Sequence, residues 1–339
     1  MTAPSGVTAN PLQNGHDALV AVVCGAVTSL VACGARDAGE VIARKGCLVS
    51  GSTVDELIDR FRAWAERAPD VQALAIVGSR ARAQDPADEW SDVDVVIVAD
   101  DPARYLANSE WLADIGRCRL TFVQESPFAG LYERRAHFDG GTVFDLIVIA
   151  PDVIRLAADL PATADLISRG WRALVDKQGL AARFADLVGR SATSRARTPP
   201  GSADLADATA RFWHSCIWTA RKVCRGELWV ATVAINCGLH ESLLQLLEWE
   251  AETRPGGDDT DVWFRGRFLE RWADPAAVRL LGKTFTPYDR DSAARSLRIV
   301  ARLYSELTTQ IARRVGCSPP RDIENYGSDT VEAILCDFV

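Results

Sequence analysis

The chain has 339 residues, with 38 basic side chains against 46 acidic ones and a formal net charge of −8. Its 48% hydrophobic and 25% charged content is ordinary for a globular protein, which excludes a disordered chain, a collagen and a coiled-coil rod. The acidic balance disfavours a nucleic-acid partner, because neutralising phosphates requires clustered lysine and arginine, and it suits a small cationic partner. A chain of this length is expected to form two or three domains.

Residues 1–50 are expected to form an N-terminal extension that is partly disordered, since residues 1–17 are rich in glycine, proline, asparagine and threonine. The stretch 18–35 is uncharged and largely apolar, but glycine, threonine and serine dilute it and no basic residue precedes it. It therefore predicts a partly buried helix rather than a membrane anchor or a secretory signal. Nine cysteines without a C-x-x-C spacing favour reduced thiols, so we expect a cytoplasmic protein with no membrane partner.

The first domain is predicted over residues 51–155, with a mixed β-sheet and helices. Thr53 and Glu56 form a capping box at the start of an amphipathic helix, which ends near Pro69. Strands are then predicted where apolar runs are bounded by glycine or polar residues. These strands cover residues 73–77, 93–98, 119–124 and 143–149.

The second domain is predicted over residues 156–339 as an all-α helical bundle, because no strand pattern follows Pro151. A hydrophilic segment, 191–202, separates the first of its helices from the others. The expected helices cover residues 151–187, 203–224, 227–252, 261–274, 289–314 and 329–337. The fold class is therefore α+β, with a mixed-sheet domain followed by a helical domain.

The first predicted strand ends at Gly78 and Ser79, where glycine allows a sharp turn and Ser79 opens a helix. Free backbone amides at a helix start, together with a hydroxyl group, make a cradle for phosphate. Arg80 and Arg82 follow, and both guanidinium groups are candidates for charge-assisted contacts to the same phosphates. We therefore expect a nucleotide-binding turn here.

Two aspartates, Asp92 and Asp94, begin the next strand. Residues i and i+2 of a strand point to the same face, so both carboxylates project toward one point. Their mutual repulsion is costly unless a cation neutralises it, and Mg²⁺ binds a few carboxylate oxygens together with substrate phosphates. The alternative is that the pair only caps the start of the strand.

A third carboxylate, Asp145, interrupts the apolar run 143–149. Three strand-borne acids suit a two-metal phosphoryl-transfer site, in which the cations stabilise the attacking and leaving oxygens together. The alternative is that Asp145 forms an ion pair with a buried arginine.

The set Gly78-Ser79, Asp92-x-Asp94 and Asp145 resembles the nucleotidyltransferase superfamily that shares the DNA polymerase β-type core. Within it, the chain is most similar to the aminoglycoside 6-adenylyltransferases, the streptomycin-modifying group, because Asp92 follows Gly78 by 14 positions. The resemblance extends over residues 52–337. Further segments similar to that group are Gln124–Pro127, Phe212-Trp213, Ala220-Arg221 and Arg225-Gly226-Glu227.

The resemblance implies a nucleotidyltransferase domain in which Asp92, Asp94 and Asp145 bind Mg²⁺, with two ions, and ATP is the co-substrate. Asp145 would be a metal ligand or would aid deprotonation of the acceptor. Gly78 and Ser79 would hold the β- and γ-phosphates.

Three further residues receive roles from the resemblance. Arg82 would bind phosphate, and Arg221 would reach a phosphate from the helical domain unless it is only a solvated helix arginine. Glu227 would be an acceptor-side base, unless it only stabilises the dipole at a helix start.

The resemblance implies that the protein is an enzyme whose acceptor is a small cationic molecule, with an aminoglycoside of the streptomycin type as the favoured acceptor. One alternative keeps the reaction but uses a protein hydroxyl, as in toxin–antitoxin nucleotidyltransferases. Another is a nucleotide-binding module without catalysis. The sequence leaves open the nucleotide preference, the hydroxyl modified and the oligomeric state.

Overall fold

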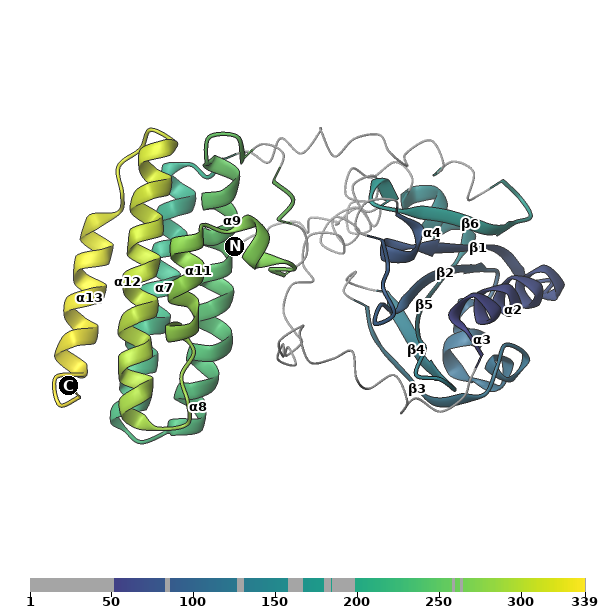
Figure 1. The fold of residues 1–339 in the computed structure, drawn as a ribbon, viewed down its shortest axis with the longest axis horizontal. Coiled ribbons are helices and arrows are strands. Elements are labelled where there is room, and N and C mark those ends of the chain that lie inside the picture. Colours follow the sequence, from purple (N-terminus) through teal and green to yellow (C-terminus); the bar gives the residue numbers. More distant parts are fainter. Residues whose placement is uncertain are drawn as a thin grey trace, which may run out of the picture. The chain divides into compact units, whose positions relative to one another are not determined.

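The computed structural model describes residues 52–82, 86–126, 131–157, 167–179, 184, 199–257, 260–262 and 265–338. The extension expected over residues 1–50, with its apolar stretch 18–35, lies outside the described residues. The chain forms two compact units, Met1–Ser194 and Arg195–Val339 (Figure 1). The first contains a β-sheet with flanking helices and the second is helical, so the α+β fold class is confirmed.

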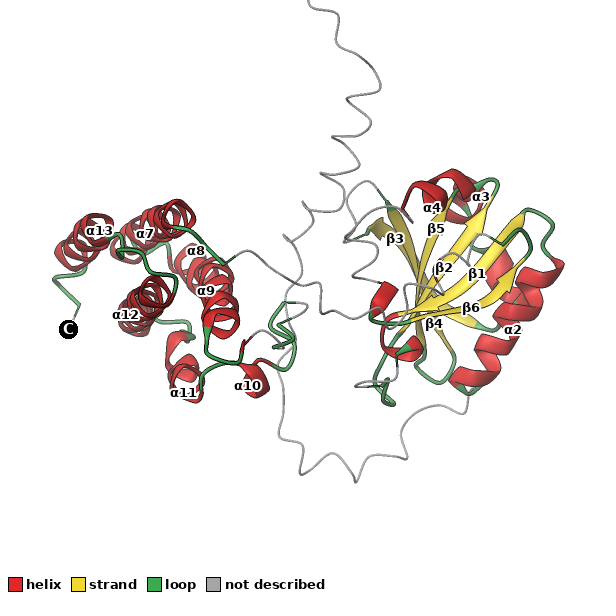
Figure 2. Ribbon diagram, turned by 90° about the horizontal axis from the view of Figure 1, so that it is seen from above, coloured by secondary structure: helices red, strands yellow, loops and turns green. Residues whose placement is uncertain are grey.

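The first unit is built on a six-stranded sheet in the order β3-β4-β5-β2-β1-β6 (Figure 2). Strands β2 and β5 run parallel, whereas the other four neighbouring pairs are antiparallel. The strands are β1 Val71–Val77, β2 Val93–Ala99, β3 Cys118–Glu125, β4 Tyr132–Phe138, β5 Val143–Ile149 and β6 Trp171–Asp176. The mixed sheet predicted from the sequence is therefore present.

Helices cover both faces of the central strands, and every residue of β1 is buried. One face packs against α2 (Val54–Arg67), α3 (Pro102–Ala107) and the short turn η3 (Glu110–Asp114), with Phe61 and Tyr105 in the shared core. The predicted capping box opens α2. The other face packs against Ile154 of α4 (Pro151–Ala157).

The prediction that strands stop after Pro151 is wrong. Helix α4 covers Pro151–Ala157, and β6 lies inside the range 151–187 that was expected to be helical. Residues 158–166, 180–183 and 185–187 of that range lie outside the described residues. Strand β6 pairs antiparallel with β1 at the edge of the sheet. An edge strand needs no continuous apolar run. Because β6 contains the charged residues Arg172 and Asp176, its sequence lacks the apolar run by which the other strands were predicted. The sheet therefore runs past residue 155, where the sequence analysis ends the first domain.

Strand β4 is also absent from the sequence analysis, which predicts no strand between 124 and 143. Its segment contains three charged residues in succession, Glu133, Arg134 and Arg135, so it shows no apolar run that would predict a strand. Glu133 and Arg134 are nevertheless buried, and they point to opposite faces of the sheet. This strand carries charged residues into the site described below.

The second unit is a helical bundle (Figure 1). The helices predicted at 203–224, 227–252 and 289–314 are confirmed. Among the described residues of 261–274, only Leu269–Trp272 is helical. The helix Pro275–Thr284 was not predicted, and the last helix begins at Arg321 instead of residue 329. The segment Ala234–Leu239 is π-helical. The other helices are α7 Ser202–Cys224, α8 Leu228–Val233, α9 His240–Thr253, α10 Leu269–Trp272, α11 Pro275–Thr284, α12 Arg290–Arg314 and α13 Arg321–Ile334.

The bundle core is closely packed between α7, α12 and α13. The rings of Phe212 and Tyr304 stack with centroids 3.6 Å apart. Gly327 of α13 lies against Trp213 of α7, where an added Cβ atom would lie 2.4 Å from the indole ring. The two helices approach closely because this position has no side chain.

Among the described residues, one helix, Leu228–Thr253, is long and apolar enough to cross a membrane by length and composition. Its residues Ile235, Leu239 and Leu243 belong to the core of the second unit. A core helix of a globular bundle meets the same criterion, so this helix is weak evidence for a membrane span.

Candidate active site

The three predicted acids meet at one end of the parallel strand pair. Strand β2 aligns with β5 so that Asp94 is directly opposite Asp145, and Asp92 lies two residues before Asp94. One carboxylate oxygen from each residue lies within 4.8 Å of those of the other two. Asp145 is 6% exposed, and the other two are half-buried. The register of two strands therefore assembles the cluster that the sequence predicts.

Burial and crowding raise the pKa values of two of these carboxyl groups. Desolvation raises the pKa of Asp94 to about 7, and the charges of Asp92 and Asp145 add to the effect. Desolvation also raises the pKa of Asp145 to about 7, although the guanidinium of Arg135 opposes the rise. The cluster therefore resists holding all of its negative charge without a cation.

The donor set fits a divalent cation of the Mg²⁺ type. It offers three carboxylate groups, which are the hard oxygen ligands that Mg²⁺ prefers. The Oδ1 atom of Asp145 is buried and has no hydrogen-bond partner among the described residues. A buried oxygen without a partner is uncommon in native proteins, and a bound cation would supply the missing interaction.

Gly78 lies against Asp94, and there is no room for a side chain at this position. Its φ is +68°, a left-handed conformation that favours glycine, and an added Cβ atom would lie 2.6 Å from Oδ2 of Asp94. Ser79 is buried within the same turn. The helix expected from Ser79 is a 3₁₀ turn, η2 Gly78–Ala81, which brings the backbone of this turn next to the acids.

Gly170, which the sequence analysis does not identify, supports this turn. Its carbonyl oxygen accepts a hydrogen bond of 3.3 Å from the Gly78 amide. An added Cβ atom at Gly170 would lie 2.6 Å from the Gly78 carbonyl oxygen and 2.9 Å from the Arg82 amide nitrogen. Gly170 directly precedes β6, so only knowledge of that strand would have drawn attention to it.

The two arginines of the turn occupy different surroundings. The Arg80 guanidinium donates hydrogen bonds to the carbonyl oxygens of Asp88, Ser91 and Asp92, at 3.3, 2.7 and 3.1 Å. It therefore fixes the loop that leads into Asp92, a role that the sequence analysis did not assign to it. Arg82 is half-buried at the end of η2.

Two charged residues of β4, Glu133 and Arg135, lie next to the acid cluster, and the sequence did not predict them there. The β4–β5 register places Arg135 opposite Asp145, and a guanidinium nitrogen lies 2.9 Å from Oδ2 of that aspartate. The buried carboxylate of Glu133 lies 3.2 Å from the same nitrogen. The alternative in which Asp145 only forms an ion pair with an arginine is met in part, because Asp145 pairs with Arg135 and also belongs to the acid cluster.

Comparison with known proteins identifies the family of this chain. A family model described as streptomycin adenylyltransferase matches residues 52–329. The chain belongs to the streptomycin adenylyltransferase family. It is therefore a nucleotidyltransferase, as the resemblance in the sequence implies.

Individual relatives are distant in sequence from this family member. The chain is 21% identical to the aminoglycoside 6-adenylyltransferase of Staphylococcus aureus over 286 residues, which are 81% of this chain and 97% of that protein. An aminoglycoside 6-adenyltransferase structure from Bacillus subtilis has a TM-score of 0.38 and 16% identity, over 84% of this chain and 99% of that one. A nucleotidyltransferase-like protein from Exiguobacterium sibiricum has a TM-score of 0.33 and 14% identity, over 77% of each chain.

The second unit contains two of the predicted site residues, Arg221 and Glu227. Arg221 is exposed on α7. Glu227 precedes α8, and its carboxylate forms ion pairs with Lys222 at 2.6 Å and Arg225 at 2.7 Å. The hydrogen bond from Lys222 lowers the pKa of Glu227, which makes this carboxylate a weaker base.

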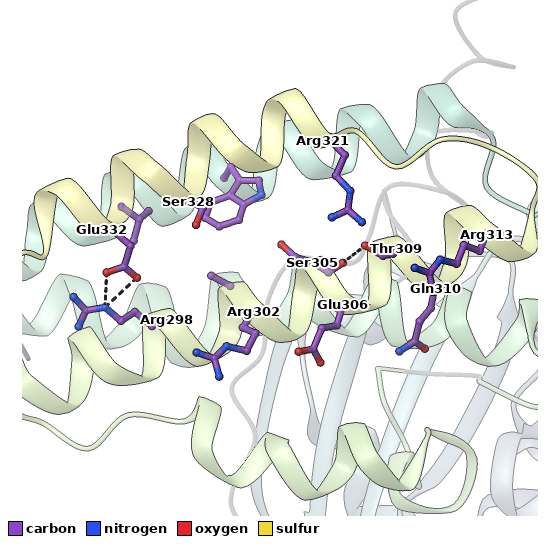
Figure 3. Close-up of a pocket in the computed structure, with 13 residues that line it drawn as sticks. Arg298, Arg302, Ser305, Glu306, Thr309, Gln310, Arg313, Arg321, Ser328 and Glu332 are labelled. Carbon is purple, nitrogen blue, oxygen red and sulfur yellow. Dashed lines mark hydrogen bonds and ion pairs between the residues drawn. The ribbon is translucent and has the colours of Figure 1, made fainter.

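The second unit also contains a groove of about 590 Å³ between α12 and α13 (Figure 3). Figure 3 shows Arg298 of α12 directed at Glu332 of α13, to which it is bonded at 2.9 Å. The same guanidinium donates to the carbonyl oxygens of Leu335 and Phe338. None of the predicted site residues lines this groove, and its ion pair ties the two helices together.

Proposed function

We propose that the protein transfers AMP from ATP to a hydroxyl group of an aminoglycoside, with a streptomycin-like molecule as the favoured acceptor. The observation that carries the proposal is the meeting of Asp92, Asp94 and Asp145 within 4.8 Å, beside a glycine turn. Family membership supports nucleotidyl transfer of the aminoglycoside type. The acceptor oxygen would form a bond to the α-phosphorus of ATP, while the bond to the bridging oxygen breaks and pyrophosphate leaves.

The three acids would have two roles, which are binding Mg²⁺ and accepting the proton of the acceptor hydroxyl. Asp92 and Asp94 would hold Mg²⁺, with Asp145 as a further ligand and two ions bound during the reaction. Bound Mg²⁺ supplies charge neutralisation for the phosphate oxygens and for the leaving pyrophosphate. Gly78, Ser79 and Arg82 would contact the β- and γ-phosphates and keep the leaving group in line with the acceptor.

Asp145 is the better candidate for accepting the proton of the attacking hydroxyl. Its carboxylate belongs to the acid cluster, within 4.8 Å of those of Asp92 and Asp94, where the acceptor hydroxyl would meet the α-phosphate. Glu227 is a poorer candidate, because Lys222 and Arg225 hold its carboxylate and lower its pKa.

The loop before β2 suits a cationic acceptor. Asp88 and Glu89 are exposed, and the indole of Trp90 is 70% exposed beside them. Hydrogen bonds from Ser91 and nearby backbone amides lower the pKa of Asp88, which keeps that carboxylate charged at neutral pH. Carboxylates beside an aromatic ring attract ammonium and guanidinium groups. We propose a cytoplasmic location, because the nine cysteines of the sequence include no C-x-x-C spacing.

The test is pyrophosphate release from Mg-ATP in the presence of a panel of aminoglycosides, with streptomycin first. Asp92→Ala and Asp94→Ala serve as blanks, and Asp59→Ala, an exposed aspartate of α2, is the matched control. Release that requires both the drug and the two site aspartates supports the proposal. ATP binding without release across the panel contradicts it and redirects the search to protein hydroxyls or to a binding module.

A further inference from the structure

A row of three side chains leads across the sheet to Asp145. The register places Gln124 of β3 opposite Glu133 of β4, and Arg135 of β4 opposite Asp145 of β5. The Gln124 amide donates to Oε1 of Glu133 at 2.7 Å, and the Arg135 guanidinium donates to the same oxygen twice, at 3.2 Å. Arg135 then reaches Oδ2 of Asp145 at 2.9 Å. We call Gln124, Glu133 and Arg135 the relay.

Burial makes each link of the relay difficult to replace by water. Glu133 is 3% exposed, so hydrogen bonds from Gln124 and Arg135 take the place of water at its carboxylate. Arg135 is held by two of its nitrogens against that carboxylate, which leaves its guanidinium plane fixed in front of Asp145. The relay therefore occupies Oδ2 of Asp145, while Oδ1 is buried and has no partner among the described residues.

We propose that Arg135, held by Glu133 and Gln124, is a positioning residue that presents Oδ1 of Asp145 to the cation shared with Asp92 and Asp94. With Oδ2 occupied, Asp145 contributes one oxygen instead of swinging to chelate with both. The inference rests on the cation site of the proposed function and adds to it the part that orients the third acid. Partners that orient a metal-ligating carboxylate contribute to metal affinity although they never touch the metal.

Two variants separate orientation from charge. Arg135→Lys keeps the positive charge beside Asp145 but loses the planar fork that binds two carboxylates at once. Gln124→Met removes the hydrogen bond to Glu133 with similar side-chain length and no change in charge. A purely electrostatic role of Arg135 leaves cation affinity unchanged in both variants, whereas the relay predicts a loss in both.

The assay is Mn²⁺ binding followed by electron paramagnetic resonance, with α,β-methylene-ATP present and no acceptor. We expect Arg135→Lys to weaken Mn²⁺ binding about tenfold or more, and Gln124→Met to weaken it by a smaller factor. The matched control is Arg314→Lys, because Arg314 holds the buried Glu250 at 2.7 Å in the second unit. Thermal unfolding of all three variants accounts for any general loss of stability.

Unchanged Mn²⁺ affinity in Arg135→Lys, or an equal loss in Arg314→Lys, overturns the inference. If Arg135→Lys does not fold, unchanged affinity in Gln124→Met overturns it instead. The inference and the proposed function fail separately in this design. Normal AMP transfer with an unaffected Arg135→Lys contradicts the inference alone, whereas relay-dependent Mn²⁺ binding without transfer to any aminoglycoside contradicts the acceptor alone.

Discussion

Replacing Gly78 with alanine is expected to disable the site by moving Asp94. The added Cβ atom would lie 2.6 Å from Oδ2 of Asp94, where ordinary contact begins at 3.4 Å, so the carboxylate must retreat by about 0.8 Å. A displacement near 1 Å in a catalytic group costs about 100-fold in rate. The left-handed φ of +68° adds about 1–2 kcal/mol of backbone strain in any residue with a Cβ atom.

Gly179 provides the matched control for that variant. Its φ is +69°, but an added Cβ atom would meet nothing within 4 Å. Gly179→Ala should therefore lose similar stability in chemical denaturation and keep its rate of pyrophosphate release. Gly78→Ala should lose about 100-fold in that rate and also bind Mn²⁺ more weakly. Equal activity in the two variants would refute the argument that Gly78 is required by contact with Asp94.

Three further predictions concern pH, helix packing and the second unit. Since burial raises the pKa of Asp94 and of Asp145 to about 7, the metal-free protein should lose stability as pH rises from about 4 to about 7, measured as the free energy of unfolding in urea. Cation binding should instead tighten over the same range, because the acids must lose their protons. Gly327→Ala should destabilise the bundle by about 1–3 kcal/mol through its clash with the indole ring of α7, whereas Gly282→Ala, with open space around it, should be neutral or stabilising in the same assay. Glu227→Gln should reduce pyrophosphate release less than tenfold, and a loss as large as that of Asp145→Asn would identify Glu227 as the base.

The acids and the glycine turn could be predicted from the sequence because their signals are local. Asp92 and Asp94 lie two residues apart in one strand, and Asp145 interrupts an apolar run, so each is conspicuous without its neighbours. Strands β1, β2 and β5 were predictable for the same reason, since burial on both faces produces continuous apolar runs.

The missed parts of the site depend on cross-strand register, which no single segment contains. Glu133 and Arg135 look like surface residues in a charged segment until β4 is paired with β5. The need for glycine at position 170 comes from its contact with the turn at Gly78, which lies more than 90 residues earlier in the chain. Arg80 was predicted to contact phosphate, but its partners in the structure are backbone carbonyl groups, which the charge of the side chain alone does not predict.

The position of β6 sets a limit on how the chain can be divided. Strand β1 is buried along its whole length and pairs with β2 on one side and β6 on the other. A fragment that ends at residue 155 would leave one long side of β1 as an open row of unpaired amides on an apolar strand, which is a template for aggregation. The shortest fragment that keeps this strand sheltered extends through Asp176, so proteolysis or truncation inside 156–176 should yield an insoluble first unit rather than a smaller working one.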